Sequence, residues 1–310
     1  MPNIIHGGGT AGGWSESYVI DFVERTANKV FLPKEIKNIG SYAFSNFISL
    51  TQIDMPENVI SIGDQAFNGC TNLEISRLPP HLERVGIYAF YNCKKITIRK
   101  FPDLISELGR YSFAQCDMLT TLELPANLRI IGDSAFYKCP NLLIPSIPAG
   151  VSSIGVSAFS LCTNLSLSSL PESITEIKSS AFNGCTNLPL TSLPSQLKTI
   201  ESNCFGNCSN LALTELPEGI TVIKLSGFAF CPKITLTKLP DSLTTLESQA
   251  FWACTGLTEI SIGSNIQTIV SSAFYMCENL TSITINRAQD AVAGAPWGAT
   301  NATVTWIGTT

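Results

Sequence analysis

The chain has 310 residues, 45% hydrophobic and 14% charged, so it has enough apolar side chains for a folded core and is not a disordered chain. Its formal net charge of −5 argues against nucleic acid as a partner, because proteins that bind the phosphate backbone carry clustered Lys and Arg. Membrane insertion is not expected, since prolines and serines interrupt the longest uncharged stretch, residues 139–171.

The first 31 residues are expected to lead into a repeat array and to cover its first coil. Residues 1–13 are rich in Gly and predict a flexible lead, without the basic and apolar segments of a signal peptide. Residues 14–31 predict an N-terminal cap made of a short helix, which Ser15 can cap, and a first strand. The residues that would share the apolar face of this helix are Tyr18, Val19, Phe22 and Val23.

Residues 32–285 form eleven repeats of 23 residues without an insertion. Each repeat has a Phe after a small residue, and a Cys follows three residues later in all repeats but the first. The unit is L-P-x-x-[LIV]-x-x-I-x-x-x-A-F-x-x-C-x-x-L with four or five further residues. No single unit can bury its own apolar face, so the repeats must stack as a solenoid. The marker residues are Phe44, Phe67, Phe90, Phe113, Phe136, Phe159, Phe182, Phe205, Phe228, Phe251 and Phe274.

Three segments of the unit predict local structure. Pro followed by Glu or Asp favours a turn, and the residues after it are spaced for a short strand or turn. The A-F-x-x-C segment predicts a 3₁₀ or α turn. The Leu-rich closing segment predicts the strand of the main sheet, in a version L-x-x-I-x-I (50–55) and a version L-x-L-x-x-L (165–170). The second version predicts a local bulge or shift, because its apolar residue moves by one place.

Residues 286–310 predict a C-terminal cap. Residues 288–293 can form one or two helical turns, Pro296 and Gly298 favour a turn around Trp297, and 303–307 alternates like a strand. We expect that strand to pair with the last coil while Trp297 and Trp306 cover its apolar end. The alternative is that both tryptophans are exposed anchors for a partner.

The repeat motif resembles the BspA-like leucine-rich repeats of bacterial and protist surface proteins, from about Leu32 to Ile285. The resemblance implies an arc-shaped leucine-rich-repeat solenoid, commonly an adhesive role, and no catalytic residues. The expected fold is therefore an α+β or β-rich, right-handed repeat solenoid with capped ends. The ending 295–303 also resembles endings of repeat proteins from bacterial genomes and prophages.

Side chains that could carry chemistry are better explained by the repeat. Ten cysteines occupy one inward position, which favours buried free thiols over disulfides or a metal array. His6 and His81 have no nucleophile at a fixed spacing, and the acids of the position two residues before Pro never fall in neighbouring repeats. We therefore expect neither catalysis nor a cofactor or bound metal.

The predicted function is a surface or secreted adhesin-like module that binds host or neighbouring-cell proteins or glycans, with self-association also open. The alternatives are a prophage-encoded particle component and, less favoured, a polysaccharide-active enzyme. The candidate contact surface is a strip of small hydroxyls, with two aromatic residues as the next choice. These residues are Ser146, Ser166, Ser168, Ser169, Thr191 and Ser192, followed by Trp252 and Tyr275.

One further repeat position, four residues before the marker Phe, carries Gly in the first six repeats and changes afterwards. Val270 stands there in the last repeat, which indicates that the position does not require a positive φ. In the four repeats between the glycine repeats and the repeat of Val270, this position predicts a ladder of alternating charges on neighbouring coils. Its members are Lys178, Glu201, Lys224 and Glu247.

Overall fold

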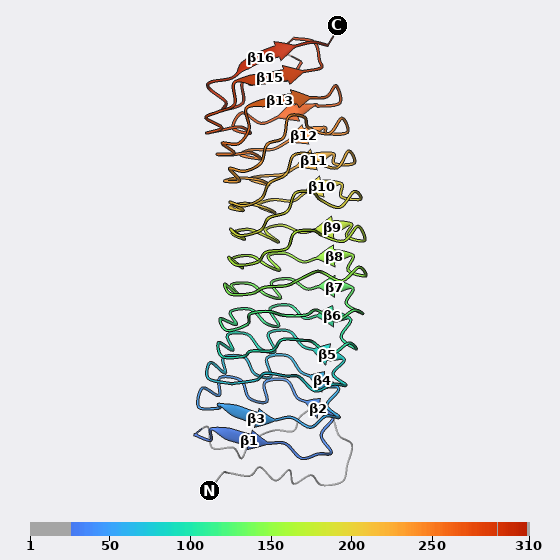
Figure 1. The fold of residues 1–310 in the computed structure, drawn as a ribbon, viewed down its shortest axis with the longest axis vertical. Coiled ribbons are helices and arrows are strands. Elements are labelled where there is room, and N and C mark those ends of the chain that lie inside the picture. The colour runs from blue at the N-terminus through green and yellow to red at the C-terminus, as the bar shows by residue number, and fades with distance from the viewer. Residues whose placement is uncertain (1–25, 290, 309–310) are drawn as a thin grey trace. The chain divides into compact units, whose positions relative to one another are not determined.

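The computed structural model describes residues 26–289 and 291–308, in two compact units that divide the chain after residue 151. Within each unit the chain winds as stacked coils of one repeat each (Figure 1). The helix expected around Ser15 lies outside the described residues.

The regular strands are short and mostly follow the repeated Pro. Each adds to the strand of the previous coil in a parallel ladder, β2-β4-β5-β6-β7 in the first unit and, in the second, β8-β9 and β10-β11-β12-β14. The apolar residue of each pair faces the core, as in Ser61–Ile62. The strands of the first unit are β2 Asn38–Ile39, β4 Ser61–Ile62, β5 Arg84–Val85, β6 Glu107–Leu108 and β7 Ile130–Ile131. Those of the second are β8 Ser153–Ile154, β9 Glu176–Ile177, β10 Thr199–Ile200, β11 Val222–Ile223, β12 Thr245–Leu246 and β14 Thr268–Ile269.

The closing segments form strands only near the two ends of the array, so the expectation that they carry the main sheet is wrong for most coils. In the first unit β1 pairs with β3, and in the second β13, β15 and β16 form a three-stranded parallel sheet. Figure 1 shows β1 and β3 on a different side of the coil from β2 and β4. The bounds are β1 Lys29–Phe31, β3 Gln52–Asp54, β13 Glu259–Ile262, β15 Ser282–Ile285 and β16 Thr303–Trp306.

The two versions of the closing segment account for most of this difference; residues 119–124 also have the first version, but they lie between closing segments of the second version and form only isolated bridges. β3, β13 and β15 have the L-x-x-I-x-I version, in which buried and exposed residues alternate along the strand. In the L-x-L-x-x-L version two exposed residues, such as Ser168 and Ser169, separate buried leucines and break the alternation. Single hydrogen bonds then join the coils, such as that from Ala212 N to Leu190 O at 3.0 Å. The shift expected at these segments therefore interrupts strand pairing.

The A-F-x-x-C segments are successive tight turns, and the described residues contain no helix, so the α part of the expected class is wrong. In the first repeat Phe47 N donates to Phe44 O at 3.1 Å, a 3₁₀-like bond within the coil. Tyr42 and Asn46, two residues on either side of Phe44, have φ of 60° and 57°. Left-handed backbone costs a non-glycine residue about 1–2 kcal/mol. It turns alternate N–H groups toward the next coil, where they meet carbonyl oxygens: Tyr42 N to Asp64 O is 2.9 Å.

The core of each unit is a column of stacked phenylalanines. The rings of Phe44 and Phe67 lie 5.1 Å apart and 1° from parallel, and those of Phe205 and Phe228 lie 5.6 Å and 9°. The repeated Cys is buried beside this column, as the sequence predicted, and its thiol donates to the carbonyl of the previous marker Phe, at 2.9 Å from Cys70 Sγ to Phe44 O. This bond gives a buried carbonyl and a buried thiol a hydrogen-bond partner at the same time.

The glycine column of the first unit reflects close approach between coils. A Cβ on Gly63 would lie 2.6 Å from Ser41 N, and one on Gly86 would lie 2.6 Å from Asp64 N. Neither glycine has positive φ, as Val270 indicated, but the backbones leave no room for a side chain. From Lys178 onward the same position holds side chains.

The C-terminal segment packs against the last coil of the second unit. β16 pairs with β15 over four residues, so the strand expected at 303–307 is confirmed. Trp297 is fully buried, its Nε1–H donates to Ala293 O at 2.7 Å, and its ring meets that of the half-buried Trp306 edge-on at 6.2 Å. The helical turns expected over 288–293 are replaced by bends and turns in the part of this segment that the structure describes.

Candidate binding surface

The hydroxyl strip lies mainly on two coils of the second unit. Ser168 and Thr191 occupy the same position of successive repeats, and so do Ser169 and Ser192, and all four are exposed. Ser166 lies two residues before Ser168 on the same segment and is also exposed. Ser146 is exposed too and belongs to the first unit.

Trp252 and Tyr275, the second choice from the sequence, are brought together on the turn segments of the second unit. Their ring centroids lie 6.2 Å apart, and Phe230 packs against Trp252 at 4.5 Å. The indole Nε1 of Trp252 lies 3.3 Å from the sulfur of Met276. We call Phe230, Trp252, Tyr275 and Met276 the aromatic row. Phe230, Tyr275 and Met276 are 38%, 48% and 44% exposed, so a large apolar surface meets solvent.

The backbone beneath the aromatic row is held by the left-handed turns. Phe230 and Met276 both have φ of 58°, and Phe230 N donates to Trp252 O at 2.6 Å. Neither residue type favours this conformation, so the stacking of the coils must impose it. Sequence reasoning missed Phe230 and Met276. The available signal was that all four residues stand one or two places after the marker Phe in three successive repeats.

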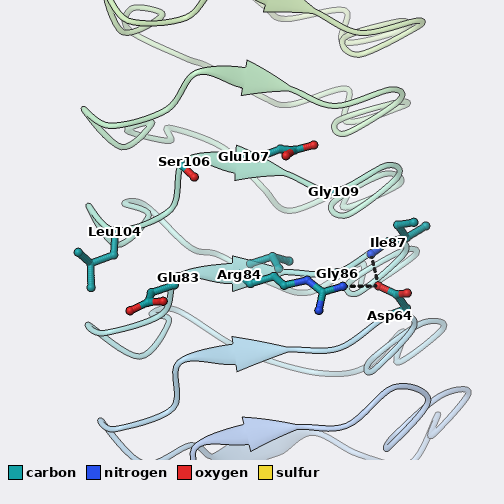
Figure 2. Close-up of a pocket in the computed structure, with 10 residues that line it drawn as sticks. Asp64, Glu83, Arg84, Gly86, Ile87, Leu104, Ser106, Glu107 and Gly109 are labelled. Carbon is teal, nitrogen blue, oxygen red and sulfur yellow. Dashed lines mark hydrogen bonds and ion pairs between the residues drawn. The ribbon is translucent and has the colours of Figure 1, made fainter. Parts of the chain in front are cut away.

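An open depression lies over β5 and β6 in the first unit (Figure 2). In this depression Asp64 Oδ1 accepts from Ile87 N at 2.9 Å and lies 3.8 Å from Arg84, whereas Glu83 and Glu107 form no ion pair among the described residues. Ile87 and Leu104 are exposed at its rim. Three coils contribute to the depression, so no local motif could have predicted it. Its side chains do not converge as an acid–base pair would require.

The acids after the repeated Pro stabilise turns. Glu172 Oε2 accepts from the backbone N and the hydroxyl of Ser195 at 2.9 and 2.7 Å, and the backbone bond is the larger cause of its lowered pKa. Glu218 Oε2 likewise accepts from Asp241 N at 3.0 Å. The hydrogen bond to Asp241 is the main cause that raises the pKa of Lys238. These carboxylates fasten one coil to the next.

The predicted charge ladder forms only at its centre. Lys224 Nζ lies 2.9 and 2.8 Å from the two carboxylate oxygens of Glu201. Lys178 instead lies 3.9 Å from Glu176 of its own coil, and Glu247 accepts from the backbone N of Leu225 at 2.9 Å. The expected four-membered ladder is therefore wrong, because the outer side chains reach nearer partners.

Within residues 26–289 and 291–308, no three His, Cys, Asp or Glu side chains are grouped to hold a metal ion. Burial raises the pKa of the Cys70 and Cys277 thiols to about 12, so both stay protonated and poorly nucleophilic near neutral pH. The described part of the chain also contains no apolar helix long enough to span a membrane.

Comparison with known proteins identifies the repeat. The model of the BspA type leucine rich repeat region matches residues 21–143, 84–212, 130–255 and 180–293, which together cover most of the chain. The chain belongs to the BspA-type leucine-rich repeat family. No curated protein matches it in sequence.

Solved structures support the fold of this BspA-type repeat protein. A leucine-rich repeat protein from Bacteroides ovatus is 24% identical, with a TM-score of 0.66 over 91% of this chain and 84% of that one. A leucine rich cell surface protein from Faecalibacterium prausnitzii is 22% identical, with a TM-score of 0.57 over 99% and 87%. The pneumococcal vaccine antigen PcpA is 15% identical, with a TM-score of 0.55 over 92% and 90%. At these identities the likeness concerns the fold.

Proposed function

We propose that this protein is a non-catalytic binding module, displayed at a cell surface or secreted, that recognises a protein ligand through the aromatic row. Leucine-rich-repeat proteins are generally non-catalytic binding modules, and one structural relative is described as a cell surface protein. The exposure of Phe230, Tyr275 and Met276 is the observation that carries the proposal.

The chemistry of the aromatic row suits a protein partner. Trp and Tyr are enriched among the residues that dominate binding energy, and Met adapts to irregular apolar surfaces. The rings rest against one another on a hydrogen-bonded backbone, so binding would immobilise little that is not already ordered. A ligand that covers the row would remove apolar surface from water at about 25 cal/mol per Å².

The test is binding of the purified chain to immobilised extracellular-matrix and cell-surface proteins. Trp252→Ala and Tyr275→Ala should each weaken binding to the recognised protein about tenfold or more. Tyr42→Ala is the matched control, because Tyr42 is a 59% exposed tyrosine on a turn segment of the other unit. Urea melts exclude unfolding as the cause. Folded variants that bind as well as the control would exclude the aromatic row.

The hydroxyl strip is the competing surface. It can donate and accept hydrogen bonds without the desolvation penalty of charged groups. Ser169→Glu with Ser192→Glu would place two carboxylates on it. If that variant alone loses the ligand, the binding surface is the strip and not the aromatic row.

A further inference from the structure

Four half-buried tyrosines gather on the turn segments of the first unit, apart from the aromatic row, which belongs to the second. Tyr88 and Tyr111 stack at 4.6 Å and 5°, and Tyr91 meets Tyr88 edge-on at 5.3 Å. Tyr137 meets Tyr111 edge-on at 6.3 Å. We call these four residues the tyrosine cluster. The stacked pair covers one face of each of its rings, while the phenol hydroxyls are left for other contacts.

The cluster presents unused hydrogen-bonding groups. The hydroxyls of Tyr88, Tyr111 and Tyr137 have no partner among the described residues, whereas that of Tyr91 accepts from Gln115 Nε2 at 2.8 Å. The side-chain oxygen of Asn92 is covered and also has no partner. An unpaired covered acceptor costs about 1–3 kcal/mol, so a ligand hydroxyl that reaches it after a small side-chain movement would recover part of that cost.

Two cations flank the cluster. Arg110 lies 5.3 Å above the ring of Tyr111, and Lys138 lies 5.2 Å from the ring of Tyr137. Both are exposed, and neither forms an ion pair within the described residues. The surrounding residues 84–138 contain eight Lys or Arg and five Asp or Glu, a surplus of three positive charges in a chain of net charge −5. Arg110 and Lys138 therefore bring two cations without an ion pair to the tyrosine cluster.

We propose that the tyrosine cluster binds an acidic glycan, a chain of hydroxyl-rich sugars that carry carboxylate or sulfate groups. The phenol hydroxyls and the amides of Asn92 and Gln115 would bond sugar hydroxyls, while Arg110 and Lys138 would pair with the anionic groups. This site is separate from the aromatic row and does not depend on the proposed function of that row.

The arrangement favours a glycan over other partners. Single-stranded nucleic acid stacks its bases on open aromatic faces, but Tyr88 and Tyr111 stack on each other and the other two rings pack edge-on. Tyr and Arg also occur in protein hot spots, but there they fill desolvated pockets, whereas these rings pack against one another and leave three hydroxyls without a hydrogen-bond partner and two cations without an ion pair among the described residues. Sugar hydroxyls match the free polar groups best.

Calorimetric titration tests the proposal with four probes: hexagalacturonate, a heparin-derived hexasaccharide, neutral cellohexaose and a thymidine hexanucleotide. At least one acidic hexasaccharide should bind, and added salt should weaken that binding. Hexagalacturonate carries carboxylates alone, whereas the heparin fragment carries both carboxylates and sulfates, so binding of the heparin fragment only would show that sulfate is required. Binding of neither acidic sugar, equal binding of cellohexaose, or tighter binding of the oligonucleotide would each overturn the proposal.

Variants locate the site. Tyr88→Phe, Tyr111→Phe and Tyr137→Phe combined keep the ring packing and remove the free hydroxyls, and should weaken the acidic glycan about tenfold. Arg110→Ala with Lys138→Ala should weaken it similarly and reduce its salt dependence. Tyr42→Phe, at a 59% exposed tyrosine outside the cluster and outside the aromatic row, is the control and should change nothing. Glycan binding that survives both sets of changes in folded protein would also overturn the proposal.

Discussion

The burial of Trp297 predicts that the C-terminal segment is a structural cap, and Trp297→Ala tests this. Trp297 is fully buried, its carbonyl accepts from Phe274 N at 3.0 Å, and its ring supports the half-buried Trp306. Without the indole, the apolar end of the last coil would lose its cover, and β16 would lose the side-chain packing next to it.

The expected loss of stability is large for one side chain. Removing a buried Trp typically costs about 3–5 kcal/mol through lost burial and the cavity left behind. The edge-on contact with Trp306 adds about 0.5–1.5 kcal/mol that the alanine variant cannot recover. The indole hydrogen bond adds little, because Ala293 is exposed and its carbonyl can bind water instead.

Because each coil of a solenoid contacts mainly its neighbours, the effect should be greatest near the C-terminus. Hydrogen exchange should accelerate in β15 and β16 more than in β10 or β11, and a urea melt should begin at lower denaturant. Trp297→Phe keeps an aromatic ring and should cost less than the alanine change. Tyr275→Ala, at a 48% exposed side chain, should change stability by about 0.5 kcal/mol or less.

The opposite result would indicate a binding tail. If Trp297→Ala leaves the urea melt and the hydrogen exchange of β15 unchanged but abolishes ligand binding, the hypothesis of a structural cap is wrong. Deletion of residues 295–310 distinguishes the two roles in the same way. A cap predicts soluble aggregates, since the exposed apolar coil and open sheet edge would associate.

Three further predictions concern the body of the array. The free energy of unfolding should fall as pH rises from 9 toward 12, because the thiols of Cys70 and Cys277 have a pKa of about 12 in the folded protein and an ordinary thiol pKa of 9.0 when unfolded. Urea melts that give the same free energy across this pH range would contradict this. Lys224→Glu should destabilise the protein by about 1 kcal/mol more than Lys224→Ala, since it replaces an ion pair with repulsion, and high salt should reduce the difference; equal melts for the two variants would refute it. Gly132→Ala should lower the free energy of unfolding by about 1–3 kcal/mol, because the added Cβ would overlap the backbone of the neighbouring coil. Gly219→Ala is the control, because its Cβ would meet the flexible end of a lysine side chain; equal thermal midpoints for the two variants would refute the prediction.

Much of the fold could be predicted from the sequence because one period governs the whole array. A 23-residue spacing of Phe, Cys and aliphatic residues can bury its apolar face only by stacking, and the predicted inward positions, such as Phe205 and Cys208, are fully buried. The terminal strand at 303–307 was also predictable, since it alternates beside a final apolar coil.

The candidate sites were harder to predict, because they depend on residues that meet across coils. Trp252 and Tyr275 were named from composition, but their contact with Phe230 and Met276 depends on how the turn backbone directs each side chain. The charge ladder failed for the same reason. Lys178 reaches Glu176 in its own coil, which regular spacing across coils could not indicate.

The sequence by itself determined the repeat, the stacking and the membership of the core, since burial of apolar side chains follows directly from their period. Tertiary structure alone decided which segment forms the continuous ladder and where the backbone becomes left-handed. Those choices depend on hydrogen bonds between residues 22 to 24 apart, such as Phe230 N to Trp252 O and Tyr42 N to Asp64 O, which exist only once neighbouring coils have stacked.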